Sequence, residues 1–307
     1  ILPALSKRVP IIWRLSDMWP MTPHAAYAYG CECYKKGPEN CVCKLTSYPP
    51  IYRNTKQMLW NIKDKIYRES DITIVAPSSW IGKMAKESLL LSRFPIYTIH
   101  NGIDLGVFYS RDKQQARKML GIPQGAKVIL FSAHGLDNNP RKGSNLLIES
   151  LNKIGKISNT ILLLVGEGGE SFEGKISLPI KRLGFIKNQS RLAEIYSAAD
   201  VIVVPSVVEN LPNNLLEAMA CGTPAVAFDS GGIGDAVEHM KTGYLARYKD
   251  TQDFAEGLKL LLGNEELRRR LAEESLKLIK EKFDRKAESK AFEKLYFELV
   301  QKRKNRL

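Results

Sequence analysis

The sequence lacks any apolar run of the roughly 18 residues that a membrane-spanning helix needs. Its longest apolar runs, such as residues 161–165, have only the length of a strand. No charged segment followed by an apolar stretch and a small-residue cleavage site is present, so no signal peptide is indicated. Low-complexity segments and internal repeats are also missing. We therefore expect a soluble, cytoplasmic protein.

Length and composition define the broad class. The chain has 307 residues, of which 44% are hydrophobic and 26% charged, so it can bury a sizeable core and has no signature of disorder. A chain of this length predicts two domains. The sequence begins at Ile1 in an apolar run that ends in a strand-like stretch over residues 9–15, as expected for the interior of a domain.

The formal net charge is +13, from 46 Lys and Arg against 33 Asp and Glu. Such an excess favours anionic partners: phosphates, nucleic acid or acidic lipid. Nucleic acid is disfavoured because the basic residues are spread along the chain, without a helix-turn-helix, RNP or zinc-finger motif. The C-terminal cluster favours either peripheral contact with an anionic membrane or a solvated tail, and it comprises Lys302, Arg303, Lys304 and Arg306.

Four of the five cysteines form two C-x-C pairs, Cys31 with Cys33 and Cys41 with Cys43. Four thiolates can hold a structural zinc, although C-x-x-C spacing is more typical of such sites. Disulfides are disfavoured in a reducing cytoplasm. The remaining interpretations are a structural zinc site and reduced thiols in a loop, and the spacing favours the reduced thiols. Cys221 lies in an apolar helical segment and is expected in the core.

Apolar strands alternate with helices along most of the chain. Strands are expected at residues 71–75, 96–99, 128–133, 161–165, 201–204 and 224–228. Helices are expected from 80 to about 91 and at 145–154, 191–199, 212–220, 253–262, 265–283 and 286–301. Fully apolar strands separated by helices indicate parallel strands covered on both faces. The pattern predicts an α/β protein with a doubly wound sheet.

Ligands of open α/β sheets bind beyond the carboxyl ends of the strands, near helix N-termini. The loop after strand 201–204 contains Glu209, and Glu217 follows one turn inside the helix that Pro212 opens. With the helix dipole, free amides make an anion site there, from Asn213, Asn214 and Leu215. The loop carboxylate can accept hydrogen bonds from sugar hydroxyls, and the helix carboxylate can hold a ribose. On spacing alone, a capped helix with a solvent-facing Glu explains the pattern equally well.

Two further loops follow strands of the same sheet. Residues 229–235 include Gly231 and Gly232, whose backbone can approach a ligand and offer amides to phosphate. Residues 138–143 include Arg141 and Lys142, cations that can neutralise a diphosphate leaving group. Each loop alone is explained equally well as an ordinary turn or as solvated charge. Three such loops at one edge of a sheet predict a binding site.

A family resemblance rests on these residues. Glu209 and Glu217 form an E-x7-E pattern, which the sequence AMACGTP continues over residues 218–224. Together with Ser230-Gly231-Gly232 and Gly243-Tyr244-Leu245, it resembles glycosyltransferase family 4, the group 1 retaining glycosyltransferases of the GT-B fold. Residues 100–104, 165–168 and 198–200 follow the family's order. Residues 13–20, WRLSDMWP, are similar to a branch that acts in polysaccharide and lipopolysaccharide assembly.

The resemblance implies two Rossmann-like doubly wound domains that face a cleft. A partial acceptor-side domain would occupy residues 1–102, and a nucleotide-sugar-binding domain residues 103–282. A C-terminal helix, residues 283–307, would pack back on the N-terminal domain. The family's N-terminal domain normally holds roughly another hundred residues, including a Gly-rich loop. We therefore expect an N-terminally truncated chain with exposed strand edges, weak donor binding and poor turnover.

The resemblance also implies a reaction. A hexose would pass, with retention of configuration, from a UDP- or GDP-linked sugar to a lipid-linked or growing cell-surface polysaccharide. Front-face attack requires no cofactor, no metal at the reaction centre and no protein nucleophile, so catalysis is positioning plus electrostatics. Glu209 would contact the donor sugar, Glu217 the ribose and Lys142 the diphosphate. Asp17 would lie on the acceptor side, and the other donor-side residues would be Arg141, Asn210, Leu211, Asn213, Asn214, Leu215, Gly231 and Gly232.

The sequence departs from the family pattern at two places. Residues 132–135 read Ser-Ala-His-Gly where the family usually carries an Arg, and Arg141 is the candidate substitute. Ser16 precedes Asp17 where many members have His. Two alternative functions stay open. One is a non-catalytic nucleotide-sugar-binding module, and the other is a nucleotide-sugar epimerase of the same fold, a class that lacks the paired Glu context.

Overall fold

The computed structural model describes residues 1–39, 41–43, 52–155 and 157–305. The chain divides into two compact units: Ile1–Asn101 with Lys286–Leu307, and Gly102–Arg285. Among the described residues no helix is long and apolar enough to cross a membrane.

The first unit contains a three-stranded parallel sheet in the order β1-β2-β3. Its strands are β1 (Ile12–Arg14), β2 (Thr73–Ala76) and β3 (Ile96–Thr98). The helices are α1 (Leu2–Ser6), α2 (Cys33–Lys36), α3 (Lys56–Arg68), α4 (Ser79–Glu87) and α11 (Arg285–Lys304). The strand expected over residues 9–15 is shorter than predicted because only residues 12–14 pair with β2.

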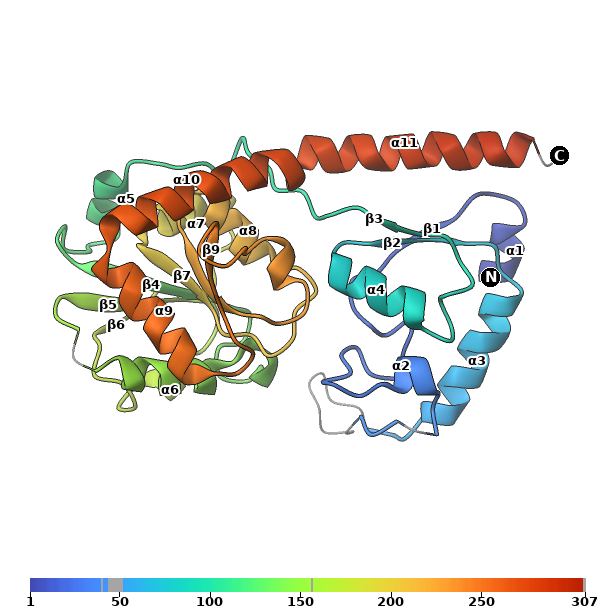
Figure 1. Cartoon of the computed structure of the whole chain (residues 1–307), viewed down its shortest axis with the longest axis horizontal. Helices are drawn as coiled ribbons and strands as arrows, with labels where there is room; N and C mark the ends of the chain where they lie inside the picture. Colours follow the sequence, from blue (N-terminus) through green and yellow to red (C-terminus); the bar gives the residue numbers. More distant parts are fainter. Residues whose placement is uncertain (40, 44–51, 156, 306–307) are drawn as a thin grey trace. The chain divides into compact units, whose positions relative to one another are not determined.

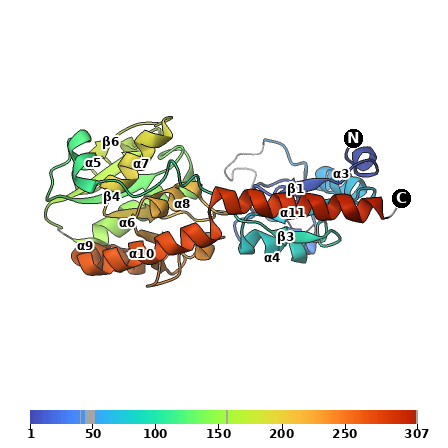
Figure 2. The same cartoon turned by 90° about the horizontal axis from the view of Figure 1, so that it is seen from above.

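Helix α11 packs along the sheet of the first unit, as both views show (Figures 1 and 2). Leu295 of α11 is buried against Val75 of β2 and Ile99. Near the helix end, Arg303 donates hydrogen bonds to the backbone carbonyls of Ser6 and Lys7. This basic residue, predicted to belong to a membrane-facing or solvated cluster, is thus engaged within its own unit. Arg306 of the same predicted cluster lies outside the described residues.

The second unit is built on a six-stranded parallel sheet in the order β6-β5-β4-β7-β8-β9. Its strands are β4 (Lys127–Ser132), β5 (Thr160–Val165), β6 (Ile180–Arg182), β7 (Val201–Val204), β8 (Ala225–Phe228) and β9 (Gly243–Ala246). Its helices are α5 (Lys113–Met119), α6 (Ser144–Ile154), α7 (Gln189–Ala198), α8 (Asn213–Ala220), α9 (Thr251–Gly263) and α10 (Glu265–Lys282). The predicted doubly wound α/β architecture is confirmed.

Two hydrophobic layers enclose the six-stranded sheet, since α6 and α9 pack on one face and α5, α7 and α8 on the other (Figure 1). The central strands β7 and β8 are buried along their whole length, as expected for strands covered on both faces. Side-chain oxygens of Asn188, Asp250 and Asn264 accept hydrogen bonds from the first-turn amides of α7, α9 and α10. These caps fix where the helices begin on the sheet.

Candidate functional site

The strand order places a switch point in the middle of the sheet. From β4 the chain proceeds outward through β5 and β6, and then returns to β7 on the other side of β4. The loops after the adjacent strands β4 and β7 therefore lead in opposite directions. Ligands of doubly wound sheets bind in the crevice between two such loops. The loop after β4 carries Arg141 and Lys142, and the loop after β7 carries Glu209. Two of the three predicted loops thus flank the switch point, and the third follows β8 beside β7.

Glu209 forms an ion cluster with the two cations of the neighbouring loop. Its Oε1 lies 2.5 Å from Lys142 Nζ, and its Oε2 lies 2.7 Å from Arg141 Nη1. The Glu209 side chain is 7% exposed, and each cation is 14% exposed. The Ser206 hydroxyl donates a longer hydrogen bond of 3.4 Å to Glu209 Oε1. The structure therefore brings together three residues that the sequence nominated from two separate loops.

The backbones of these loops approach each other closely. A Cβ at Gly143 (φ +76°), directly after Lys142, would overlap the carbonyl oxygen of Pro205. A Cβ at Gly231 (φ +63°) would overlap the carbonyl oxygen of Glu209. The amide of Gly232 donates to that same carbonyl at 3.0 Å. Glycine is required at both contacts because no side chain fits and the backbone is left-handed.

Gly232 therefore has a different role from the one predicted. We expected its amide to face a phosphate, but that amide holds the loop after β7 against the loop after β8. A similar correction applies to Leu215, whose amide donates to the carbonyl of Pro212 at 3.2 Å and closes a turn. Pro212 itself is the N-cap of α8 and not its first helical residue.

The remaining predicted residues of this segment lie at the start of α8. The Asn214 side-chain amide donates to the carbonyl of Ser132, at the end of β4, at 2.5 Å. This bond ties the start of α8 to the other strand of the switch point. Asn210 is buried in the loop, next to Glu209, and Asn213 is the first residue of the helix. Leu211 is buried in the hydrophobic layer that contains α7 and α8, so only its backbone can face a ligand.

Glu217 lies on α8 and accepts a hydrogen bond of 2.9 Å from the Tyr196 hydroxyl of α7. Burial raises the pKa of Glu217, and the hydrogen bond from Tyr196 opposes that rise. Burial and the facing Glu217 carboxylate raise the pKa of Tyr196 well above its usual value, so the tyrosine acts as a donor. Tyr196 is an orienting residue that the sequence analysis missed, because an internal helical tyrosine has no distinctive local pattern.

The loop after β5 joins the same edge of the sheet. Asp137, which follows β4, accepts hydrogen bonds from the amides of Gly169 at 2.7 Å and Ser171 at 3.2 Å, beyond β5. Desolvation alone would raise the pKa of Asp137, but hydrogen bonds from Ser171 and Gly169 outweigh it and lower the pKa to about 2. Asp137 was not among the residues predicted from the sequence.

The predicted acceptor-side residue, Asp17, belongs to the first unit. It follows β1, and its Oδ1 accepts a hydrogen bond of 2.8 Å from the amide of Trp19. Lys63 of α3 donates to the carbonyls of Trp19 at 2.6 Å and of Thr22 at 2.9 Å. The segment after β1 is thus held against α3.

The second unit defines a class: a doubly wound α/β domain with a cation–carboxylate cluster at its switch point. Residues 112–278, within this unit, match the family model described as "Glycosyl transferases group 1". The match extends over more than half of the chain, and the chain belongs to this family. The family resemblance found in the sequence is thereby confirmed.

Individual relatives agree with this assignment. N-acetyl-alpha-D-glucosaminyl L-malate synthase of Bacillus anthracis is 30% identical over 243 residues, which cover 77% of this chain and 62% of that protein. Sucrose-phosphate synthase from Thermosynechococcus elongatus is similar with a TM-score of 0.68 and 25% identity, over 81% of this chain and 63% of that one.

Anabaena HepE, solved in complex with UDP-glucose, shares the fold with a TM-score of 0.69 and 20% identity. The match covers 94% of this chain and 72% of HepE. These likenesses support the predicted GT-B class of fold. The chain spans less than two thirds of the curated Bacillus relative's length.

Proposed function

We propose that this chain forms the nucleotide-sugar-binding part of a retaining glycosyltransferase. The enzyme moves a hexose from a UDP- or GDP-linked donor to a lipid-linked or growing cell-surface polysaccharide. One observation carries the proposal: Lys142 and Arg141 converge on Glu209 at the switch point of a group 1 glycosyltransferase domain. Cations beside a carboxylate fit a ligand that is a diphosphate at one end and a polyol at the other.

Donor binding redistributes the contacts of this ion cluster. The diphosphate takes over the hydrogen bonds of Lys142 and Arg141, which now go to Glu209 at 2.5 and 2.7 Å. The carboxylate that they release accepts hydrogen bonds from hydroxyls of the sugar. Glu217, oriented by Tyr196, accepts from the ribose hydroxyls. Backbone amides near Asn213, together with the helix dipole of α8, supply additional positive potential for the phosphates.

The transfer step needs no protein nucleophile. The bond between the sugar's anomeric carbon and the β-phosphate oxygen breaks, and the electron pair stays on that oxygen. The acceptor hydroxyl attacks the same face of the sugar, and its proton passes to the departing phosphate. The products are a glycoside of unchanged anomeric configuration and a nucleoside diphosphate. Lys142 and Arg141 stabilise the charge that develops on the leaving group, without a metal at the reaction centre.

The acceptor class rests on different grounds. Residues 13–20 resemble the polysaccharide and lipopolysaccharide branch, and Asp17, which follows β1, accepts a hydrogen bond from the Trp19 amide. The name of the Bacillus anthracis relative instead specifies an L-malate product. An acceptor panel must therefore include L-malate beside lipid-linked oligosaccharides. Basic residues at the end of α11, such as Lys302 and Lys304, favour an enzyme that works at the inner face of the cell membrane.

Calorimetric titration with UDP and GDP tests the binding part of the proposal. Lys142→Met should weaken binding of the preferred nucleoside diphosphate at least tenfold, because one of two diphosphate cations is lost. Lys259→Met removes an exposed lysine of α9 and serves as the matched control. Equal affinities in the two variants would refute the assignment of Lys142.

Incubation with UDP- and GDP-sugars, membrane extract and L-malate tests the reaction. We expect transfer of sugar with retention at the anomeric carbon, visible by proton NMR, and undiminished turnover in EDTA. Formation of an epimer of the donor would identify an isomerase of this fold instead. Donor binding without transfer to any acceptor would identify a binding module.

A further inference from the structure

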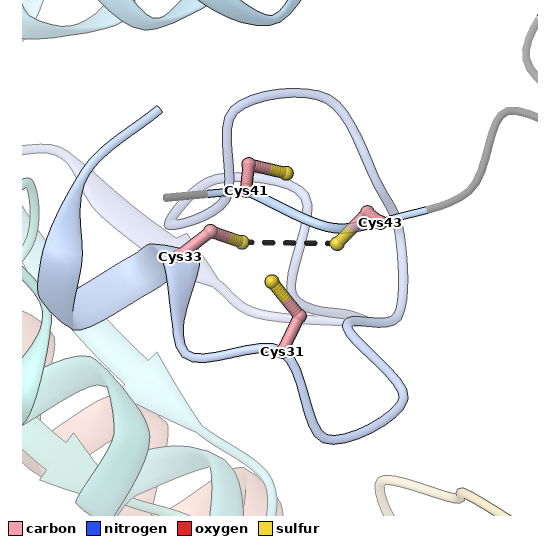
Figure 3. Close-up of side chains that lie close together, drawn as sticks. All are labelled: Cys31, Cys33, Cys41 and Cys43. Atoms are coloured by element: carbon pink, nitrogen blue, oxygen red, sulfur yellow. Dashed lines mark hydrogen bonds between the residues drawn. The ribbon is translucent and has the colours of Figure 1, made fainter. Parts of the chain in front are cut away.

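Four cysteine thiols meet at one point of the first unit. The thiol cluster, comprising Cys31, Cys33, Cys41 and Cys43, has all its Sγ atoms within 4.8 Å of one another. Figure 3 shows the four sulfurs pointing inward from two separate stretches of chain, one at the start of α2 and one beyond it. Three of the four residues are buried, and the fourth is half-buried.

The spacing between the sulfurs matches that of a tetrahedral metal site. A tetrahedron with Zn–S bonds of about 2.3 Å has edges of about 3.8 Å between sulfurs. Cys33 Sγ and Cys43 Sγ, one from each C-x-C pair, lie 3.8 Å apart. A disulfide would need a distance of about 2.05 Å, and all four cysteines are free thiols.

The surroundings of the thiol cluster favour thiolates. The amide of Val42 points at Cys31 Sγ at 3.4 Å, the arrangement in which a backbone donor stabilises sulfur that carries negative charge. Lys56 Nζ lies beside the cluster, where it donates a hydrogen bond of 3.0 Å to the backbone carbonyl of Cys41. Four thiolates around one divalent cation carry a net negative charge. The Lys56 ammonium offsets part of that charge.

The thiol cluster also lies in a part of the chain with little regular secondary structure among its described residues. Between β1 and α3 the described residues form only one short helix, α2. Tyr34 of α2 accepts a backbone hydrogen bond of 2.9 Å from Leu89, and Lys35 pairs with Glu87 at 2.7 Å. These few contacts dock α2 near the end of α4. Joining the two C-x-C pairs through a metal would close the loop and remove much of its conformational freedom.

We propose that the thiol cluster binds one structural Zn²⁺ through all four sulfurs. Four protein ligands leave no open position, so the ion holds the loop and does not act on substrate. The C-x-C spacing of the cysteines is uncommon in zinc sites and by itself favours reduced thiols. The convergence of the sulfurs outweighs that argument. The site lies entirely in the first unit and stands independently of the proposed transfer reaction.

Metal analysis of the purified protein tests the proposal. Protein produced with zinc in the medium should contain one zinc per chain by plasma mass spectrometry. Cys31→Ser and Cys43→Ser should each lose at least nine-tenths of it. Cys221→Ser removes a buried cysteine of the second unit and is the matched control, which should retain one zinc per chain. Cobalt in place of zinc should give the visible bands of a tetrahedral four-sulfur site.

Fluorescence supplies a readout that does not depend on variants. All four tryptophans, Trp13, Trp19, Trp60 and Trp80, lie in the first unit, so their emission reports on that unit alone. A strong zinc chelator should lower the urea midpoint of the fluorescence transition, and added zinc should restore it. Wild-type protein without metal, protein that contains iron in place of zinc, or intact mass and thiol counts that show disulfides among these cysteines would each overturn the proposal.

Discussion

Replacing Glu209 with Gln removes the one negative charge of the ion cluster and keeps the shape of the side chain. In the free protein the change leaves Lys142 and Arg141 facing an amide, although both cations are only 14% exposed. The two cations then repel each other without the carboxylate charge between them. Glu209→Gln should therefore destabilise the free second unit and, at the same time, improve the site for a diphosphate.

The magnitudes follow from the contacts. Removing one partner of a buried ion pair costs about 3–5 kcal/mol, because the other charge stays buried and unpaired. The amide oxygen of Gln still accepts one hydrogen bond, so we expect a loss of about 2–4 kcal/mol in the free energy of unfolding. A phosphate charge about 4 Å from the Glu209 carboxylate is repelled by about 4 kcal/mol at an effective dielectric constant of 20. Because the carboxylate can turn away from the phosphate, we expect only about 1.4 kcal/mol of relief, or about tenfold tighter binding of UDP.

Urea unfolding followed by circular dichroism, with and without UDP, measures both effects. UDP should raise the urea midpoint of Glu209→Gln by more than it raises that of the wild type. Sugar transfer should fall about 10- to 100-fold, because a charged hydrogen bond to the sugar is lost. Glu266→Gln, an exposed position at the start of α10, should change none of these quantities. If Glu209→Gln bound UDP more weakly than the wild type and transferred sugar normally, the reasoning about this cluster would be refuted.

Three further predictions concern stability. Gly143→Ala should cost at least about 2 kcal/mol, since its Cβ would collide with the carbonyl of Pro205 at a left-handed backbone position; an unchanged urea midpoint would contradict that close approach. Asp200→Asn should cost about 3 kcal/mol, because Arg117 would lose its buried partner at 2.7 Å, and a Tm equal to that of the wild type would exclude such a contribution. Burial and nearby lysines lower the pKa of His24 in the folded protein. As the pH falls, His24 is therefore protonated in the unfolded chain before it is protonated in the folded one. The stability of the first unit should accordingly fall as the pH drops below about 6.5, less so in His24→Gln, and a pH-independent fluorescence transition would argue against the shift.

The architecture of the second unit was predictable because its central strands are fully apolar and its helices are amphipathic. The strand at residues 201–204 and the helix at 253–262 differ from the observed elements by two residues or fewer at each end. The edge strands β6 and β9 were not identified as strands. β6 is only three residues long and partly exposed, so it carries little of the apolar signal that marks a buried strand.

The first unit was less predictable. Helix α3 was missed, although its buried residues Trp60, Lys63 and Tyr67 recur at helical spacing. The described residues between β1 and α3 form little regular structure, and hydrophobic periodicity gives no indication of how the cysteines there are arranged. Their convergence depends on how an irregular stretch of chain folds back on itself, which hydrophobic periodicity does not encode.

At the candidate site, chain order and strand topology nominated the correct loops but not their internal contacts. The rule that ligands bind beyond strand ends selected Lys142 and Glu209 together. It could not indicate that the amide of Leu215 closes a turn with Pro212, because that depends on the φ and ψ angles at the start of α8. Nor could it indicate that Tyr196 of another helix orients Glu217.

A crystal structure of this protein with a non-hydrolysable UDP-sugar or GDP-sugar tests the central claim most directly. The account predicts the diphosphate within hydrogen-bond distance of Lys142 and Arg141, the ribose on Glu217, and the Glu209 carboxylate turned from the cations to the sugar. A donor bound elsewhere, or a diphosphate in place with Glu209 still paired to both cations, would contradict it.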